Sequence, residues 1–432
     1  MALRLLHSWI ARASVTATSR HLLALTLVLA TPDIVRAQGG PVGDEFRINT
    51  YTTGSQRLRS MAPSGDVFVV TWESDGQDGS GSGVFAQRLT WSPLPPSPLG
   101  GEFRVNSYTT SDQSFPRVAA DGAANFFVVW QSDGQDGDSR GIYAQRYSGA
   151  GSPLGGEFRV NTFTTLAQGF PSVALAPSGE FVVVWQSEGQ DGSDYGVFGQ
   201  RYAAGGAPMG PEFRVNTYTT GPQRFAAVDA TSSGFVVAWE GYSANDQGLG
   251  IFAQRYSISG APVGGEFRVN SYTTGDQRYP AVDELAGQVA IVWQSTGQDG
   301  DGQGVFAQRY DGPNWLPQGG EFQVNTFTAQ NQASPDVMVG PGRFFITWQS
   351  DLQDGSDSGI FTRVYFSGFP TGPEFRMNTY TTGAQTGPLV IDNVPMHFTF
   401  AWTSAQDPDG STGIYAQHWA DIPVELQTFV VE

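Results

Sequence analysis

Short runs of alternating or continuous apolar residues recur along the whole chain, and turn residues separate them. One stretch holds four such runs: PSVALA (171–176), FVVVWQS (181–187), GVFGQRY (196–202) and EFRVN (212–216). The turn Pro177-Ser178-Gly179 joins the first two, and EFRVN alternates polar and apolar residues as a half-buried strand does. The stretch therefore predicts four short β-strands in sequence.

This unit of four strands occurs seven times. A tryptophan closes the second run of each unit, at intervals of 54 to 58 residues: Trp72, Trp130, Trp185, Trp239, Trp293, Trp348 and Trp402. A glycine then opens the third run: Gly83, Gly141, Gly196, Gly250, Gly304, Gly359 and Gly413. The fourth run, EFRVN or a near variant, begins at Glu45, Glu102, Glu157, Glu212, Glu266, Glu321 and Glu374.

A repeat of this size and content predicts an all-β fold, a seven-bladed β-propeller with four strands per blade. One unit is too small to be a β-sandwich, which needs roughly 100 residues, whereas four short strands repeated every 40–50 residues are typical of propeller blades. A linear β-solenoid is the alternative.

The two ends of the chain predict how the ring closes. The first run, Glu45–Asn49, is a fourth strand without its first three, and the last unit has three runs but no EFRVN after them. We therefore expect the N-terminal strand to complete the C-terminal blade. The segment Pro423–Val430 competes for the same place, but it matches the repeat poorly.

The sequence predicts three parts: a secretory signal peptide (1–37), a single propeller (38–420) and a C-terminal tail (421–432). Three arginines precede the apolar run Leu22–Ala30, and Val35-Arg36-Ala37 offers small residues for cleavage after Ala37. Nine apolar residues are too few to span a bilayer, although a membrane anchor or an unstructured tail is the alternative. We expect a secreted or cell-surface protein without membrane insertion.

Composition narrows the class of partner. The formal net charge is −18, lysine is absent, and there is no cysteine for disulfides or thiolate metal sites. Such a surface repels nucleic acid and anionic membranes and favours cations or neutral partners. We expect a monomer that binds no nucleic acid.

Acidic loops such as WQSDGQDG (130–137) follow each tryptophan. Because strand direction alternates, these loops and the YTTGxQ connections between blades should share one face of the ring. Calcium takes six to eight oxygens from carboxylate-rich loops, and the candidate ligands are Asp75, Asp78, Asp133, Asp136, Asp138, Asp191, Asp194, Asp299, Asp301, Asp351, Asp354 and Asp357. The alternative is that Asp-Gly and Ser-Asp only form tight Asx turns. Both interpretations remain open.

Other repeated residues favour structural roles. Each tryptophan ends an apolar run and should pack between blades, although exposed rings could stack on sugars. The recurring amides should satisfy backbone groups in the connections between blades, or they could bind a glycan: Gln56, Gln113, Gln168, Gln223, Gln277, Gln332, Gln385, Asn49, Asn106, Asn161, Asn216, Asn270, Asn325 and Asn378. The Glu of EFRV and the Arg of AQRY should pair across an outer hairpin.

Catalysis has little support in the sequence. Beyond residue 37 the only histidines are His397 and His418, and neither has the spacing of a catalytic triad or a metal site. No catalytic residue is predicted. Two loops depart from the repeat, Glu240–Gly250 and Thr403–Gly413, and they supply the candidate ligand-binding residues Glu240, Asp246, Asp407 and Asp409.

Units of the form EFRVNTYTTGDQ … FVVVWQSDGQDGSGxGVFAQRY, which cover residues 43–419, resemble repeats of large bacterial secreted and surface proteins. Those repeats often lie beside haemolysin-type calcium-binding or adhesion modules. The resemblance implies a secreted propeller linked to calcium and adhesion, and it implies no reaction.

We therefore expect a secreted, non-catalytic binding or surface-interaction propeller, stabilised by Ca²⁺ if the acidic loops bind it. Its ligand is a glycan or a protein at the acidic face. The alternative is an extracellular carbohydrate-active enzyme, a glycosidase or lyase, that uses carboxylates on that face.

Overall fold

The computed structural model describes residues 39–92, 95–121, 124–244, 247–312, 314–392, 397–407 and 409–420. The predicted signal peptide and the tail 421–432 lie outside the described residues. In the described part of the chain, no helix has the length and apolar character needed to cross a membrane.

The strands form seven antiparallel sheets, of which six are built from consecutive strands and the seventh combines β1 and β2 with β30, β31 and β32. The innermost strands are β3 (Gln56–Ser64), β8 (Gln113–Ala120), β12 (Gln168–Leu175), β16 (Gln223–Thr231), β20 (Gln277–Leu285), β25 (Gln332–Gly340) and β30 (Gln385–Asp392). The second strands are β4 (Val67–Asp75), β9 (Phe126–Asp133), β13 (Phe181–Glu188), β17 (Gly234–Tyr242), β21 (Gln288–Thr296), β26 (Arg343–Asp351) and β31 (His397–Ser404).

The third strands are β5 (Ser82–Thr90), β10 (Arg140–Tyr147), β14 (Tyr195–Tyr202), β18 (Leu249–Ser257), β22 (Gln303–Asp311), β27 (Ser358–Phe366) and β32 (Gly413–Ala420). The outer strands are β7 (Phe103–Arg104), β11 (Phe158–Arg159), β15 (Phe213–Arg214), β19 (Pro262–Arg268), β24 (Phe322–Gln323), β29 (Phe375–Arg376) and β2 (Phe46–Arg47). Short edge pairings add β1 (Gly40–Pro41), β6 (Ser97–Pro98), β23 (Leu316–Pro317) and β28 (Phe369–Pro370).

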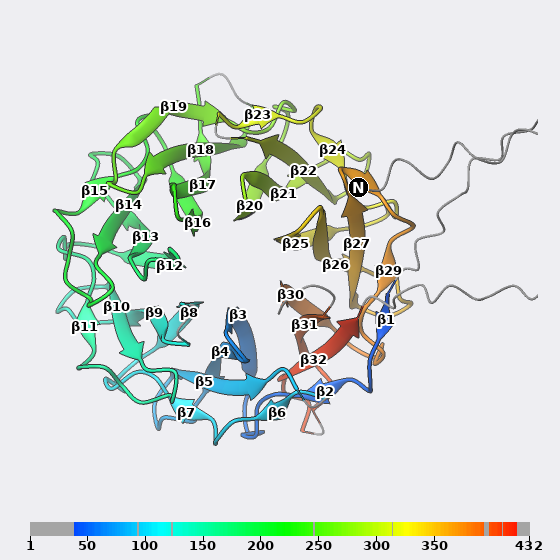
Figure 1. The fold of residues 1–432 in the computed structure, drawn as a ribbon, viewed down its shortest axis with the longest axis horizontal. Helices are drawn as coiled ribbons and strands as arrows, with labels where there is room; N and C mark the ends of the chain where they lie inside the picture. The colour runs from blue at the N-terminus through cyan, green and yellow to red at the C-terminus, as the bar shows by residue number, and fades with distance from the viewer. Residues whose placement is uncertain are drawn as a thin grey trace, which may run out of the picture. The chain divides into compact units, whose positions relative to one another are not determined.

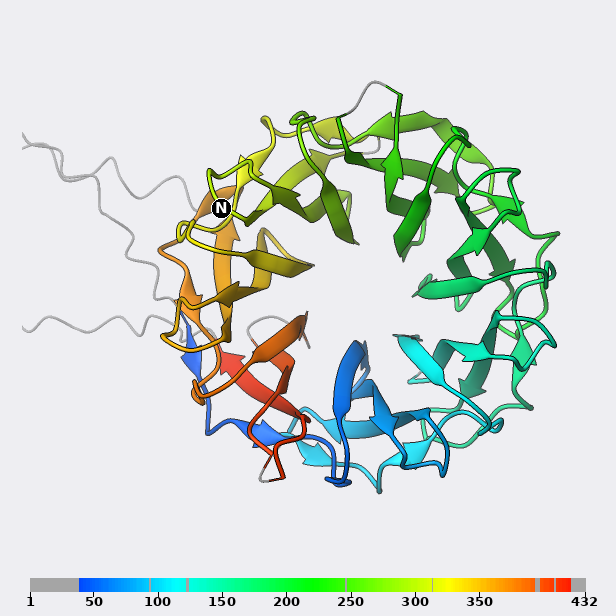
Figure 2. The same cartoon turned by 180° about the vertical axis from the view of Figure 1, so that it is seen from behind.

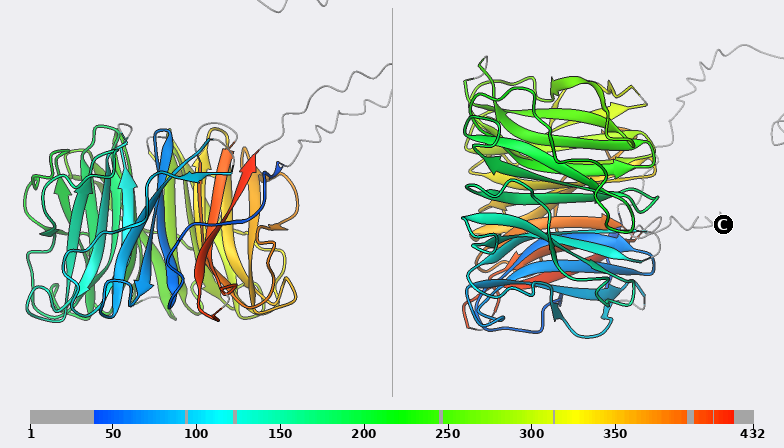
Figure 3. Two further views of the ribbon diagram at one scale, coloured as in Figure 1. Left: turned by 90° about the horizontal axis from the view of Figure 1, so that it is seen from below. Right: turned by 90° about the vertical axis from the view of Figure 1, so that its left-hand side faces the viewer.

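The seven sheets are arranged as blades around a ring, so the predicted seven-bladed propeller is confirmed. The innermost strands surround the centre and the outer strands lie at the rim (Figure 1), and the view from behind shows the same ring (Figure 2). In the side views the long strands run between the two faces of the ring (Figure 3). Blades are numbered 1 to 7 in chain order, starting with the sheet that contains β3.

The core lies between neighbouring blades. All seven repeat tryptophans are fully buried, and Trp185 of blade 3 packs in one cluster with Phe127 and Val129 of blade 2. A buried aromatic side chain removes about 150–250 Å² from water, which at about 25 cal/mol/Å² stabilises the fold by roughly 5 kcal/mol for a tryptophan. The tryptophans are therefore core residues, as predicted.

Closure of the ring also agrees with the prediction. The N-terminal β2 pairs with β32, with Phe46 opposite Ala416 and Arg47 opposite Tyr415. The pairing continues through Ile48, whose N–H donates to the carbonyl of Ile414 at 2.9 Å. Strand β2 therefore supplies the outer strand of blade 7.

The acidic loops and the connections between blades share one face, as expected. The N–H of Asp133 donates to the carbonyl of Asp112 in the preceding connection at 2.9 Å, and the N–H of Ser82 donates to the Asp112 carboxylate at 2.8 Å. We call this side of the ring the loop face. The hairpins between first and second strands lie at the other end of the same strands.

Candidate functional site

The aspartate of each QDG loop is held by its own blade. Asp78 accepts hydrogen bonds from the N–H of Ser80 at 3.3 Å and from Asn106 Nδ2 at 3.0 Å, and its carboxylate lies against Gly83. The equivalents Asp191, Asp299 and Asp354 also accept from the asparagine of their blade, and Asp136 accepts from the N–H of Asp138 at 3.4 Å. These contacts make an Asx turn that needs no ion.

Most other predicted calcium ligands also have protein partners. Asp75 binds Arg57 at 2.8 Å and Ser82 at 2.7 Å, and Asp351 binds Asn331 and Ser358. The carboxylates of Asp138 and Asp301 accept the N–H groups of Leu166 and Gln330 in the next connection. Asp194 and Asp357 accept loop N–H groups through their backbone carbonyls.

Asp133, Asp136 and Asp299 each have one carboxylate oxygen that is buried without a hydrogen-bond partner. Burial raises the pKa of Asp133. Across the described ranges, no three His, Cys, Asp or Glu side chains converge as a metal-binding group. Calcium binding by the loops stays a prediction.

The three candidate ligand-binding residues that the structure describes do not form one site. Glu240 is fully buried in blade 4, whereas Asp407 is buried in blade 7, where it pairs with Arg47 and accepts from the Tyr415 hydroxyl at 3.0 Å. Asp409 is exposed and binds Ser411, and Asp246 lies outside the described residues.

Glu240 takes part in a hydrogen bond between neighbouring blades that all seven blades make. The residue after each tryptophan accepts the backbone N–H of the third residue of the next innermost strand. Glu240 accepts from Tyr279 at 3.1 Å and also binds Arg224 at 2.9 Å. The same bond links Glu73 to Phe115, Gln131 to Phe170, Gln186 to Phe225, Gln294 to Ser334, Gln349 to Gly387 and Thr403 to Leu58. Burial raises the pKa of Glu240, against the opposing effects of the Tyr279 N–H and of Arg224.

These N–H groups belong to residues with an unusual backbone. In blades 2 to 6 the third residue of the innermost strand has a positive φ of 50–52°, and the strand register shifts there. The residues are Phe115, Phe170, Phe225, Tyr279 and Ser334. This backbone region costs roughly 1–2 kcal/mol for a residue with a Cβ atom, and in blade 7 the position is occupied by Gly387.

The positive φ places four aromatic rings side by side at the loop-face end of the innermost strands. Neighbouring ring centroids lie 4.4 Å apart for Phe115 and Phe170, 4.6 Å for Phe170 and Phe225, and 4.9 Å for Phe225 and Tyr279. The guanidinium of Arg59 continues the row, 4.3 Å from the centroid of Phe115. We call these five side chains the rim arc.

The rim arc lines one end of a central channel of about 900 Å³ that the innermost strands enclose. The rings are only partly covered, and Tyr279 is 40% exposed. Bulky residues at positive φ are uncommon and persist where the surrounding structure holds them, often at functional sites. The rim arc is therefore the strongest candidate for a ligand contact.

Deeper in the channel, carboxylates bind the N–H groups of neighbouring innermost strands. Asp229 accepts from Glu284 at 2.7 Å, Asp283 from Val339 at 2.5 Å and Asp336 from Val390 at 2.9 Å. These bonds satisfy donors that would otherwise be left open at the inner edge of each blade.

The channel carboxyl groups hold protons more tightly than usual. Burial, opposed by hydrogen bonds from the backbone, raises the pKa of Asp283 to about 6 and that of Asp336 to about 7. Burial and the charge of Asp283 raise the pKa of Asp229. Burial lowers the pKa of Arg117, which also lines the channel, to about 10. At neutral pH these three aspartates therefore carry less negative charge together than three ionised carboxylates would.

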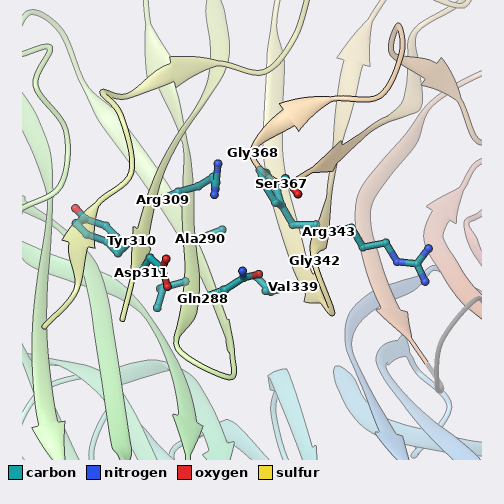
Figure 4. A pocket seen from close by; sticks show the side chains of 12 residues that line it. Gln288, Ala290, Arg309, Tyr310, Asp311, Val339, Gly342, Arg343, Ser367 and Gly368 are labelled. Atoms are coloured by element: carbon teal, nitrogen blue, oxygen red, sulfur yellow. The ribbon is translucent and has the colours of Figure 1, made fainter. Parts of the chain in front are cut away.

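A second cavity, between blades 5 and 6, is much smaller. It measures about 20 Å³ and is lined by residues such as Gln288, Arg309 and Arg343 (Figure 4). A water molecule needs about 10–15 Å³ by this measure. The cavity has room for water and not for an organic ligand.

The arginine of the AQRY run contacts the neighbouring blade and not the glutamate of its own blade. Arg146 donates to the carbonyl of Ala204 in blade 3 at 2.9 Å. Glu157 instead accepts from the N–H of Ser107 at 2.7 Å and from Gln135 at 2.6 Å. The expected Glu–Arg pair is wrong for this blade, because the two side chains point to opposite neighbours.

Sequence reasoning missed the rim arc. Its signal is present as QSF, QGF, QRF and QRY at the start of four units (Gln113, Gln168, Gln223 and Gln277). These aromatic residues occur once in each of these units, as the buried tryptophans do, so the sequence pattern does not distinguish them from core residues. Only the positive φ places them at the channel.

Comparison with known proteins supports the fold. The sequence matches no family model and no curated protein. It is similar in structure to a protein of unknown function from Dyadobacter fermentans, with 10% identity and a TM-score of 0.53 over 89% of this chain and 99% of that chain. It is also similar to the polysaccharide lyase Uly1, with 10% identity and a TM-score of 0.51 over 90% and 94% of the two chains.

More distant matches include the phage phi92 endosialidase, with 8% identity and a TM-score of 0.47 over 91% of this chain and 71% of that chain. Family-43 glycoside hydrolases match at lower TM-scores. At these identities the likenesses show a shared fold and no activity.

Proposed function

We propose that this protein is an exported binding module whose propeller takes a carbohydrate at the loop-face mouth of the central channel. The observation that carries the proposal is the rim arc. Four aromatic side chains in four successive blades, partly exposed and in contact with one another, offer a continuous apolar surface at the entrance of a channel.

Carbohydrate fits this surface chemically. The C–H groups of a sugar ring carry partial positive charge, and the face of an aromatic ring carries the negative part of its quadrupole. Binding sites combine such apolar walls with a few polar groups that fix orientation, and Arg59 and the channel carboxylates supply these. Because the chain carries a net charge of −18, a neutral or amine-bearing glycan is favoured over an acidic one.

The backbone supports a role beyond packing. Glycine fits the positive-φ position without strain, as Gly387 does in blade 7. Four blades instead keep a bulky aromatic there, at a cost in stability. Strain that is retained at a surface open to solvent is typical of ligand sites.

The test is a glycan array of neutral, amine-bearing and acidic oligosaccharides, followed by calorimetric titration of the strongest ligand. In Phe170→Gly and Phe225→Gly the ring is lost and the strain is relieved, so we expect unchanged or higher melting temperatures. We expect affinity to fall at least tenfold, which is about 1.4 kcal/mol.

Ser334→Gly is the matched control, because it changes the same backbone position in blade 6 without removing a ring. It should bind as the wild type does. If both phenylalanine variants bind with wild-type affinity, the rim arc is not part of the binding site.

The channel carboxyl groups favour a second candidate, an extracellular glycosidase or lyase. With pKa values of about 6 and about 7, Asp283 and Asp336 can exchange protons near neutral pH, as general acid–base catalysis requires. A hydrolase and lyase screen on the same sample separates the candidates. Turnover that is lost in Asp283→Asn and Asp336→Asn would favour the enzyme.

Export is part of the proposal and rests on the leader-like residues 1–37. The mature protein from the culture medium should begin at Gln38. A protein that stays in the cell with its first residues intact would contradict this part.

A further inference from the structure

Two histidines face each other in blade 7. Nδ1 of His397 on β31 lies 3.1 Å from Nε2 of His418 on β32. The whole sequence has four histidines, and the other two lie within residues 1–37. The two histidines of the described propeller are therefore in direct contact with each other.

The surroundings fix the orientation of His418. Its other ring nitrogen, Nδ1, lies 3.3 Å from Thr399 Oγ1, and in the tautomer in which Nδ1 donates to this hydroxyl the lone pair of Nε2 is directed at His397. A second hydrogen bond of this kind is the usual support of a metal-binding histidine. His418 is 1% exposed, and burial together with the neighbouring His397 lowers its pKa to about 4. Neutral imidazole is the form of histidine that binds metals.

We propose that His397 and His418 bind a divalent transition-metal ion, with Zn²⁺ as the first choice. Zinc–nitrogen bonds are about 2.0–2.1 Å long, so two nitrogens 3.1 Å apart make an angle of about 98° at the ion. This angle suits four- to six-coordinate ions. Binding requires that the Nδ1 proton of His397 moves to Nε2 of the same ring and that the exposed His397 ring turns, because the two nitrogens now point at each other. Water completes the coordination, because His397 is exposed.

Blade 7 differs from the others at this place. His418 follows the AQ of its third strand, where blades 1 to 5 have arginine: Arg88, Arg146, Arg201, Arg255 and Arg309. Arginine carries a permanent positive charge and cannot bind a cation. Blade 7 alone among these six therefore offers a neutral nitrogen ligand at the position.

The site is separate from the rim arc and from the acidic loops. The two histidines lie on the second and third strands of blade 7, in which the N-terminal strand β2 pairs with the C-terminal strand β32. Imidazole nitrogen suits zinc, copper and nickel, whereas calcium and magnesium take oxygen ligands. The histidine pair should therefore bind zinc, copper or nickel in preference to calcium or magnesium, whereas a site made of carboxylates would favour calcium or magnesium.

The test is titration of the full chain with Zn²⁺ at pH 7.5, by calorimetry and by NMR of the histidine ring nitrogens. We expect one bound ion per chain and shifts of the ring signals of His397 and His418. His397→Gln, an exposed substitution that leaves the core intact, should weaken Zn²⁺ binding at least tenfold. Thr399→Val should weaken it by about tenfold.

Two results would overturn the proposal. One is the absence of Zn²⁺ binding to the wild-type chain. The other is unchanged binding in His397→Gln with shifts confined to the other two histidines, which would place the ion in residues 1–37. Ca²⁺ at the same concentration serves as the control and should leave the signals of His397 and His418 unmoved.

Discussion

At the scale of single residues, buried asparagine side chains connect the third strand of a blade to the connection that leads to the next blade. Asn161 is 2% exposed, and its Oδ1 accepts the N–H of Ile142 on the third strand at 2.7 Å. Its Nδ2 donates to the carbonyl of Phe163 at 2.7 Å and to Gln168 Oε1 at 3.1 Å. Equivalent asparagines are buried in all seven blades. The repeated Asn and Gln are structural, as the sequence favoured.

Asn161→Leu should lower the free energy of unfolding by about 2–4 kcal/mol, because it leaves a buried donor and two acceptors without partners. Asn161→Asp keeps the acceptor for Ile142 and should cost less at a pH where the carboxyl is protonated. Denaturant unfolding measures both. Equal stability of the leucine variant and the wild type would contradict this role.

The raised pKa of Asp336 predicts a pH dependence of stability. In the folded state the pKa is about 7 because of burial and the nearby Asp283, whereas an unfolded aspartate titrates near about 3.9. Between these values the folded state holds a proton that the unfolded state releases, so stability falls as pH rises from about 4 to about 7.

Asp336→Asn can keep the bond to the Val390 N–H and removes the titration. It should raise the melting temperature at pH 8 by about 2 °C or more and flatten its pH profile. Thermal melts from pH 4 to pH 8 test this. A profile as steep as that of the wild type would assign the dependence to other groups.

At the scale of elements, the strands and their order could be predicted because the pattern of each strand occurs seven times in the sequence. The rim arc could not, since a positive φ leaves no signature in the hydrophobic pattern when the residue is phenylalanine. The acidic loops show the same limit. Asp78 and Asp191 look like ion ligands in the sequence, yet in the structure their carboxylates bind Asn106 and Asn216 of their own blades. Sequence spacing alone did not tell a turn from an ion site.

The loops make a prediction about calcium. If the loops bind calcium, millimolar Ca²⁺ should raise the melting temperature more than Mg²⁺ does at equal ionic strength, because calcium accepts irregular sites of many oxygens. Equal changes would indicate screening alone. A larger response to Ca²⁺ that shrinks in Asp133→Asn would reveal a calcium site in blade 2, where Asp133 and Asp136 each have a buried oxygen without a hydrogen-bond partner.

At the scale of the whole molecule, one short strand closes the ring. Residues 45–49 bring Ile48 into a core cluster shared by blades 7 and 1 and bring Arg47 to Asp407. Asn49 accepts the N–H of Ile414 at 2.7 Å and donates to Gln56 at 2.9 Å. The missing fourth strand of the last unit made this closure predictable from the sequence.

Deleting residues 43–49 should lower stability by about 4 kcal/mol or more, because it opens a blade edge and exposes core. Ile48→Ala is the milder variant and should cost about 2–4 kcal/mol by leaving a cavity. Thermal melting compares them with the full chain. A deletion variant that melts like the wild type would show that another segment closes the ring.

We propose that the loop-face mouth of the channel binds a carbohydrate on the rim arc. A crystal structure with the strongest oligosaccharide from the array tests it most directly. We expect sugar rings stacked against Phe170, Phe225 and Tyr279, with hydroxyl groups directed into the channel. Sugar bound elsewhere on the propeller, with the rim arc uncovered, would contradict it.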